Sequence, residues 1–222
     1  MLALKSKSQR KRVNHKILKI KRSKRYSDRI IIILDNKSVF RIPEDAFILN
    51  PLHVGDEISS KDIKKFDKKM RFKEAKDSAY RLLSYRMRSV SEMKKRLKDK
   101  SFSTDEIENT IDHLLKLNYL NDQEFCRAFS NEKVKLKKIG PFLLKSDLFK
   151  HGLDIELIDN CINEIYNQYN IQDLIEFHLE KKKIIKNELL DKKDKKRLDN
   201  YLIRKGFSWE LINNVYAEWG LI

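Results

Sequence analysis

One pattern occurs three times along the chain, and it constrains the fold more than any other feature of the sequence. The three segments are LKDKSFSTDEIENTIDHL from Leu97, LFKHGLDIELIDNCINEI from Leu148 and LIRKGFSWELINNVYAEW from Leu202, and they align without a gap. In each segment a Leu closes one helix, Ser or Gly follows at the exit, and a Ser or Asp cap precedes a second apolar stripe. Gly favours the left-handed backbone of such an exit. The pattern therefore predicts a helical repeat.

The distances between the three leucines leave room for one more helix in each unit. From Ser60 to the end of the chain, apolar residues recur at intervals of three and four, which is typical of amphipathic helices. Units of this kind bury their apolar faces against their neighbours. We expect a mainly α protein, an elongated tandem array of three three-helix repeats. The expected repeats are residues 61–120, 121–169 and 170–222.

The segment before the repeats has the shorter period of β-strands. Apolar and charged residues alternate over 18–21, residues 30–34 form a continuous apolar run, and 39–42 resemble a third strand. Pro43 and the acids after it suit the first turn of a brief helix. A last short strand carries Ile58. The sequence thus predicts a small β-rich N-terminal module over residues 16–60, preceded by a basic flexible arm over residues 1–15.

The chain is strongly basic, and this narrows the classes of partner. It contains 49 Lys and Arg against 33 Asp and Glu, a net charge of +16 over 222 residues. A charge of this sign and size favours nucleic acid or an acidic partner. No apolar run is long enough to span a membrane, and the N-terminus lacks the features of a secretory signal. We expect a cytoplasmic protein that does not contact membranes.

The sequence offers little for catalysis or cofactor binding. Its five glycines are too scattered for a phosphate-binding loop, and Cys126 and Cys161 have no CxxC or His cluster around them. Glu74-x-Lys76 and Glu180-x-Lys182 echo half of a nuclease motif, but such spacing is common on solvated helices. His113 and His151 are isolated. We therefore expect no enzyme, no catalytic residue, no metal and no cofactor.

The candidate binding residues are basic side chains near the expected corners between helices. Ser89 and Glu92 form a capping box, so a helix begins near Val90, and Arg86 and Arg88 precede this cap. A second basic group precedes Gly140, and a third lies in the last repeat. If the corners line up, they form a track for phosphates. The candidate partner- or DNA-binding residues are Arg86, Arg88, Lys94, Lys95, Lys98, Lys137, Lys138, Arg10, Lys11 and Arg12.

Four aromatic residues could either stack on nucleic-acid bases or pack in the core. They are Tyr85, Tyr119, Trp209 and Trp219, and their apolar spacing or their position beside core residues favours packing in the core. We therefore leave them out of the candidate binding set.

The segment AYRLLSYRMRSVSEMKKRLKDKSFSTDEIENTIDHLLKLNYLNDQEFCRAF resembles the core of the RecX regulatory proteins. The positions that carry the resemblance are Leu82, Leu83, Arg86, Arg88, Ser89, Glu92, Leu97, Phe102, Ile107, Leu114, Tyr119, Leu120, Asp122, Phe125 and Phe129, followed by Gly140, Leu144, Leu148, Gly152 and Leu153. The third repeat and the β-rich module match more faintly. Three features depart from the family pattern: Ser101 stands where Gly is usual, Cys126 where Ala is common, and the N-terminal arm is unusually rich in lysine.

The resemblance implies a regulator that binds RecA recombinase filaments and DNA phosphates and inhibits the filament's ATPase and strand-exchange activities. Such a protein would act in DNA recombination, DNA repair and the SOS response, and it needs no active site. The alternative is a sequence-nonspecific nucleic-acid-binding protein without a recombinase partner. A monomer is the expected state. The sequence leaves open which filament groove or end is bound and whether inhibition or stimulation dominates.

Overall fold

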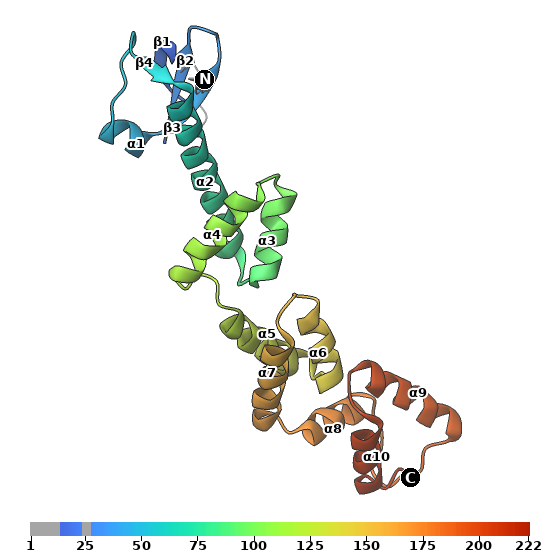
Figure 1. The fold of residues 1–222 in the computed structure, drawn as a ribbon. Helices are drawn as coiled ribbons and strands as arrows, with labels where there is room; N and C mark the ends of the chain where they lie inside the picture. Colours follow the sequence, from blue (N-terminus) through green and yellow to red (C-terminus); the bar gives the residue numbers. More distant parts are fainter. Residues whose placement is uncertain (1–13, 24–27) are drawn as a thin grey trace, which may run out of the picture. The chain divides into compact units, whose positions relative to one another are not determined.

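The computed structural model describes residues 14–23 and 28–222 (Figure 1). The predicted basic arm, including Arg10, Lys11 and Arg12, lies outside the described residues except for its last two positions. The described chain forms two compact units. One contains the residues up to Tyr80 together with Phe102–Thr110, and the other contains Arg81–Ser101 and Ile111–Ile222.

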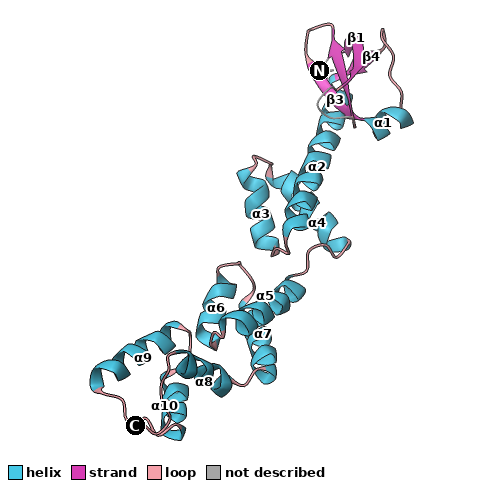
Figure 2. Cartoon of the chain, turned by 180° about the vertical axis from the view of Figure 1, so that it is seen from behind, coloured by secondary structure: helices cyan, strands magenta, loops and turns pink. Residues whose placement is uncertain are grey.

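The first unit begins with a four-stranded antiparallel sheet, as the sequence predicts (Figure 2). Its spatial order is β3-β2-β1-β4, and a short helix, α1, follows β3. Apolar side chains from all four strands form its core, and the first turns of the next helix, α2, cover it with Ile63 and Phe66. The elements are β1 (Asn14–Arg22), β2 (Arg29–Leu34), β3 (Val39–Pro43), α1 (Glu44–Leu49) and β4 (Glu57–Ser59).

The predicted alternation on the first strand is wrong at Leu18. The register between β1 and β2 shifts between Ile17 and Lys19, so Ile17 is buried and Leu18 is 53% exposed. An extra residue in one strand of a pair turns the side chains on either side of it to different faces. A single-strand pattern does not contain the partner strand, so it does not reveal this irregularity.

Helices occupy the remainder of the chain, and they fall into three groups of three. The mainly α fold with three-helix repeats and a small N-terminal sheet is therefore confirmed. The helices are α2 (Ser60–Tyr85), α3 (Val90–Asp99) and α4 (Thr104–Lys116), then α5 (Asp122–Lys137), α6 (Pro141–Phe149) and α7 (Ile155–Gln168), and finally α8 (Ile171–Lys181), α9 (Lys192–Arg204) and α10 (Trp209–Glu218).

The aligned exits and caps of the sequence repeat have equivalent backbone conformations. Ser101, Gly152 and Gly206 each follow the second helix of a group with a positive φ, at 63°, 67° and 92°. Ser103 and Glu106 form the predicted reciprocal capping box, and the side chains of Asp154 and Ser208 cap the corresponding later helices. Ser101 thus holds the left-handed exit without the conformational freedom of glycine.

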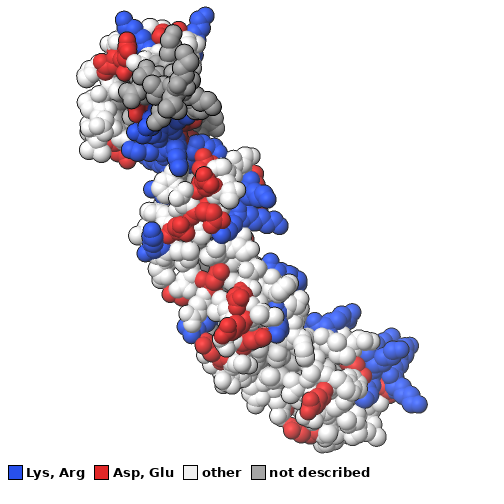
Figure 3. All heavy atoms as spheres, viewed as in Figure 1, with Lys and Arg blue, Asp and Glu red and all other residues white. Residues whose placement is uncertain are grey.

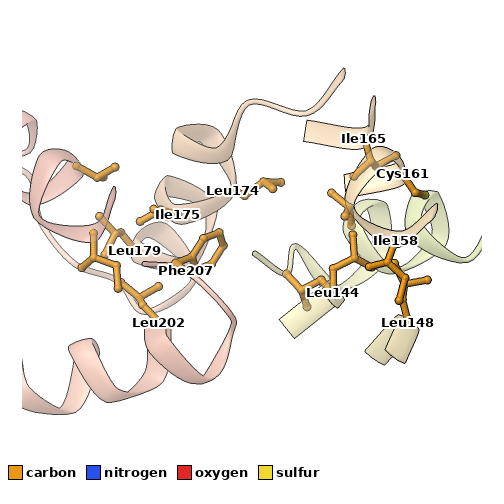
Figure 4. Close-up of a cluster of buried hydrophobic side chains, with 14 of the residues drawn as sticks. Leu144, Leu148, Ile158, Cys161, Ile165, Leu174, Ile175, Leu179, Leu202 and Phe207 are labelled. Atoms are coloured by element: carbon orange, nitrogen blue, oxygen red, sulfur yellow. The ribbon is translucent and has the colours of Figure 1, made fainter. Parts of the chain in front are cut away.

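The second and third repeats share one continuous core, which contains most of the buried side chains of α5 to α10. Figure 4 shows Leu144, Leu148 and Ile158 on one side of this cluster and Leu179, Leu202 and Phe207 on the other. The apolar core of the third repeat is therefore continuous with the apolar core of the second repeat.

A joint of the same kind connects each repeat of the second unit to the next. The residue that caps the second helix of one repeat meets a backbone carbonyl at the exit of the following repeat. Ser89 donates its hydroxyl hydrogen to the carbonyl oxygen of His151 at 2.7 Å, and the N–H of Gly140 donates to the carbonyl oxygen of Lys205 at 2.8 Å. His151 and Lys205 are equivalent positions of the aligned repeat. Two different donors therefore satisfy equivalent carbonyls.

The second joint leaves no room for side chains. A Cβ on Gly140 would lie 2.4 Å from the carbonyl oxygen of Gly206, and a Cβ on Gly206 would lie 2.4 Å from the amide nitrogen of Leu143. Contacts this short with backbone atoms require the two repeats to move apart. The glycines are therefore needed because the two backbones approach each other closely.

We expect Gly140→Ala to lower the free energy of unfolding of the third repeat by about 2 kcal/mol, through overpacking at the joint. Gly140 has a φ of −89°, which any residue adopts, so the effect isolates the close approach from backbone strain. Urea unfolding monitored by fluorescence reports on this region, because both tryptophans of the chain, Trp209 and Trp219, lie in the third repeat.

Gly55→Ala is the matched control. Gly55 has a φ of +101° in the first unit, but a Cβ there would meet nothing within 4 Å. The substitution strains the backbone locally and leaves the tryptophan transition where it was. An unchanged urea midpoint in the Gly140→Ala protein would show that the joint accepts a methyl group.

Candidate partner-binding surface

The corner between α2 and α3 holds two arginines on one carboxylate. Arg86 donates to both oxygens of Glu92, at 3.0 and 2.5 Å, and Arg88 donates to the same carboxylate. The Nε of Arg88 also donates to the carbonyl oxygen of Leu82 at 3.1 Å. Arg88 is only 9% exposed, whereas the side chain of Arg86 is 49% exposed. Arg86 therefore stands at the surface, and Arg88 belongs to the interior of the corner.

Glu92 is held in its charged form by these partners. Burial raises the pKa of Glu92, but the hydrogen bonds and charges of Arg86 and Arg88 outweigh it and hold the pKa below its usual value. The imidazole of His151 lies 3.9 Å from the same carboxylate and packs edge-on against Phe125 and Phe129. Burial lowers the pKa of His151 despite the nearby Glu92 charge, so the ring is neutral at neutral pH.

The start of α3 is also fixed to the second repeat. Val90 donates its N–H to the carboxylate of Asp122 at 2.8 Å, where α5 begins. Burial raises the pKa of Asp122, and this hydrogen bond opposes the shift. Together with the Ser89 contact to His151, the bond anchors the corner on both sides. Side chains on the outer face of α3 are thus presented from a stiff support.

The candidate lysines of α3 differ in exposure. Lys95 and Lys98 are exposed, as their helical positions predict, whereas Lys94 is half-buried. In the second repeat Lys137 is exposed, and Lys138 ends α5 in a left-handed conformation with a φ of 51°. The carbonyl oxygen of Lys138 accepts a hydrogen bond from the buried ring of His178 at 2.8 Å. Of these five lysines, Lys95, Lys98 and Lys137 are therefore best placed to meet a partner.

Basic residues also gather on α9, within the third basic group that the sequence places in the last repeat. Figure 3 shows Lys and Arg over α3 and over α9 on the face that it presents. A groove of about 720 Å³ lies between α9 and the segment that precedes it. Its lining combines Lys182, Arg197 and Arg204 with Asp194, Asn200, Tyr201 and apolar side chains. Asp194 pairs with Arg197 at 3.0 Å, and the ammonium group of Lys182 lies 4.6 Å from the centre of the Tyr201 ring. The groove suits an anionic group joined to an apolar or flat one.

The prediction that four aromatic residues pack in the core is wrong for three of them. Tyr85 is 78% exposed, Tyr119 57% and Trp209 49%, whereas Trp219 is buried as predicted. The three exposed residues lie at the ends of helices or in the turns beside them, where helical periodicity no longer decides which face a side chain takes. Tyr85 ends α2 and directly precedes Arg86, so the first corner has an exposed aromatic residue followed in sequence by an exposed basic one.

The groups considered for catalysis make structural contacts. Glu74 of the first ExK pair binds the guanidinium of Arg29 at 2.6 Å, between β2 and α2. In the described part of the chain, no three His, Cys, Asp or Glu side chains are placed to hold a metal ion together. None of the helices in these described residues is both long enough and apolar enough to cross a bilayer.

These features define a class: a helical-repeat binding protein with basic and aromatic side chains at its corners. The family models for RecX match it directly, the first three-helix domain over residues 75–114 and the third over residues 170–216. The RecX regulatory protein of Bacillus licheniformis is 32% identical over 209 residues, covering 91% of this chain and 76% of the relative. That of Bacillus subtilis is 32% identical over 197 residues, covering 89% and 74%. The chain belongs to the RecX family of regulatory proteins.

Solved structures agree with the fold. A crystal structure of a regulatory protein RecX superposes with a TM-score of 0.68 at 22% identity, covering 91% of this chain and 99% of that one. RecX from Lactobacillus salivarius gives a TM-score of 0.58 at 21% identity, covering 68% and 98%. The relatives are named as regulatory proteins and not as enzymes, so the chain has a regulatory role.

We expect Glu92→Gln to lower the free energy of unfolding by about 2–3 kcal/mol at neutral pH, because it leaves a buried arginine without its counter-charge. The carboxylate of Glu92 has a lowered pKa in the folded state, so its stabilisation is present above the unfolded value and is lost as pH falls through the folded value. The difference between wild type and variant should therefore shrink in acid. Hydrogen exchange of the α3 amides measures it locally.

Glu164→Gln is the control for this prediction. Glu164 pairs with Arg127 at 2.9 Å, but both side chains are about half exposed, at 50% and 51%. Solvent screens such a pair, and we expect a much smaller loss than in the Glu92 variant. Equal losses in the two variants would mean that the corner is no more than a surface ion pair.

Proposed function

We propose that this chain binds RecA recombinase filaments and inhibits their ATPase and strand-exchange activities, as a non-enzymatic regulator of DNA recombination and repair. The observation that carries the proposal is the pairing, in a RecX-family protein, of exposed aromatic with exposed basic side chains on a stiff corner. Aromatic residues and arginine dominate the binding energy of protein interfaces, whereas phosphate contacts need basic residues alone. Tyr85 beside Arg86 fits a surface that meets protein as well as DNA.

The proposed mode of action needs no chemistry. A ligand shifts an equilibrium only as far as it prefers one state over another. A protein that binds one conformation of the filament better than the next would therefore slow the cycle that ATP turnover drives. The proposal places this protein in the cytoplasm, as a monomer in the SOS response, where recombinase filaments form on DNA.

Phosphates of the filament's DNA are the proposed partners of the basic groups. Arg86, Lys95, Lys98 and Lys137 are exposed, and α9 adds further lysines and Arg197. Lys94 and Lys138 are partly buried, so they contribute charge at longer range. We leave Arg88 out of the contact set because both its position and its hydrogen bonds commit it to the corner.

The second candidate function is sequence-nonspecific nucleic-acid binding without a recombinase. The net charge of +16 and the basic groove beside α9 favour it. In that case phosphates would supply nearly all of the affinity, and added salt would remove it. The two functions therefore differ in whether aromatic side chains at the corner affect a filament more than they affect bare DNA.

We expect Lys95→Glu combined with Lys98→Glu to raise the concentration that half-inhibits the recombinase about tenfold, since two attractive contacts become repulsive. The measurement is the DNA-dependent ATPase of the cognate recombinase, with this protein at a small fraction of its concentration. Lys61→Glu with Lys64→Glu, exposed on α2 at the same spacing, changes the net charge equally. Equal losses from both pairs would assign the effect to net charge and remove α3 from the proposed surface.

We expect Tyr85→Ala to weaken filament binding about tenfold, a typical loss for an aromatic anchor, while the fold and bare-DNA binding stay unchanged. Binding to filaments and to the same DNA without recombinase is compared by fluorescence anisotropy at two salt concentrations. Filament binding should also persist at the salt that strips the protein from DNA. If Tyr85→Ala weakens both complexes alike, Tyr85 stacks on bases and the second function stands.

A further inference from the structure

The two cysteines, 35 positions apart in the sequence, lie side by side inside the second repeat. Cys126 is on α5 and Cys161 is on α7, and both are buried free thiols. Both side chains belong to the same buried apolar cluster, and the interaction between the two thiols shifts both of their pKa values. The hydroxyl of Ser130, one turn further along α5, lies 3.3 Å from the sulfur of Cys161. The packing of α5 on α7 brings the two cysteines together. Their spacing in the sequence does not indicate this proximity, because it depends on tertiary contacts.

The two thiols differ in their access to solvent. A pocket of about 330 Å³ opens on α5 and α7 and includes Cys161 in its lining, beside Arg127 and Glu164. Cys161 is 4% exposed and Cys126 is 0% exposed. The other lining residues are Gln123, Leu157, Asn160, Asn163 and Asn167. A small polar molecule in the pocket therefore meets Cys161 first, with Cys126 behind it.

The surroundings also make Cys161 the more reactive thiol. The interaction with Cys126, the hydrogen bond with the Ser130 hydroxyl and the charge of Arg127 lower the pKa of Cys161, against the opposing effects of burial and of the Glu164 charge. The pKa of Cys126 is raised by its interaction with Cys161 and by burial, which disfavours the thiolate. The thiolate is the nucleophilic form of cysteine, whereas an ordinary buried cysteine is inert.

We propose that Cys161 is a peroxide-sensitive site and that its oxidation closes a disulfide bond to Cys126. The Cys161 thiolate attacks one oxygen of hydrogen peroxide: a sulfur–oxygen bond forms, the oxygen–oxygen bond breaks, and hydroxide leaves. The sulfur is oxidised by two electrons and the peroxide is reduced. Cys126 then attacks the sulfenic acid, the sulfur–sulfur bond forms, and the hydroxyl leaves as water with the thiol proton.

The disulfide bond would join α5 to α7 across the second repeat, which is itself joined to both neighbouring repeats. It closes a loop of chain between residues 126 and 161, and such a cross-link constrains the unfolded state. The oxidised protein is therefore more resistant to unfolding, and a thiol reductant reverses the change. The inference rests on the fold alone and does not depend on the proposed function.

The test uses the full chain, first reduced and then exposed to hydrogen peroxide. We expect both thiols to become unreactive together, with the intact mass falling by two hydrogens and one cross-linked peptide linking residues 126 and 161. Dithiothreitol should restore both thiols. Oxidation should accelerate as pH rises, because the thiolate form of Cys161 becomes more populated. Disulfide-linked dimers, a single oxidised thiol that gains oxygen, or two thiols that survive peroxide would each overturn the proposal.

Variants separate the roles of the two cysteines. Cys126→Ala removes the interaction that lowers the pKa of Cys161, so the assay is run at alkaline pH, where Cys161 should accumulate as a sulfenic acid that a cyclic diketone traps. In Cys161→Ala, Cys126 should stay reduced at the same pH. Arg127→Gln alters a half-exposed side chain beside the pocket, so the fold should persist while oxidation slows several-fold at pH 7. Equal trapping of the two cysteines in their single variants would contradict the assigned order. If either alanine variant fails to fold, peptide mapping of the wild-type chain still decides the outcome.

Discussion

The backbone contact between consecutive repeats is the constraint on which the rest of the second unit depends. At each joint, the residue before a second helix meets the exit of the next repeat, through Ser89 at the first joint and Gly140 at the second. Exits with a left-handed backbone turn their carbonyl groups toward the neighbour, and the absence of side chains at Gly140 and Gly206 lets the backbones meet. Hydrogen bonds of this kind satisfy polar groups that would otherwise be buried without partners.

The hydrogen bond from the Ser89 hydroxyl to the second repeat explains why the first corner is stiff. Ser89 has two roles, because its hydroxyl caps α3 and also donates to the second repeat. Arg88 donates to the carboxylate of Glu92 on the buried side of the corner, and Arg86 donates to the same carboxylate on the exposed side. A charge pair of this kind is costly to bury, but breaking it is more costly still. The surface side chains nearby, Tyr85 and Lys95 among them, are therefore carried on a support that keeps their spacing.

Buried polar contacts hold the exposed side chains of the second unit in position for binding a partner. Differences in affinity between two states of a partner are sharper when the contact groups are already in position. His178 contributes to this on the second joint, where its ring links the hydroxyl of Tyr201 to the carbonyl oxygen of Lys138, at 2.9 and 2.8 Å. Burial lowers the pKa of His178, so this link stays neutral. The second and third repeats therefore form one interior and not two separate modules.

The sequence by itself determined the helical repeat, its caps and exits, and the small sheet, because these depend on residues close together in the chain. The period of apolar residues, the Ser89–Glu92 box and the three aligned exits each describe one helix or one turn. Only the tertiary structure decided that Arg88 is interior, that Tyr85, Tyr119 and Trp209 are exposed, and that Cys126 meets Cys161. Burial depends on which element from elsewhere in the chain packs against a residue. The local sequence around an arginine that precedes a helix cap is the same whether its partner is a buried carboxylate or a phosphate of a ligand.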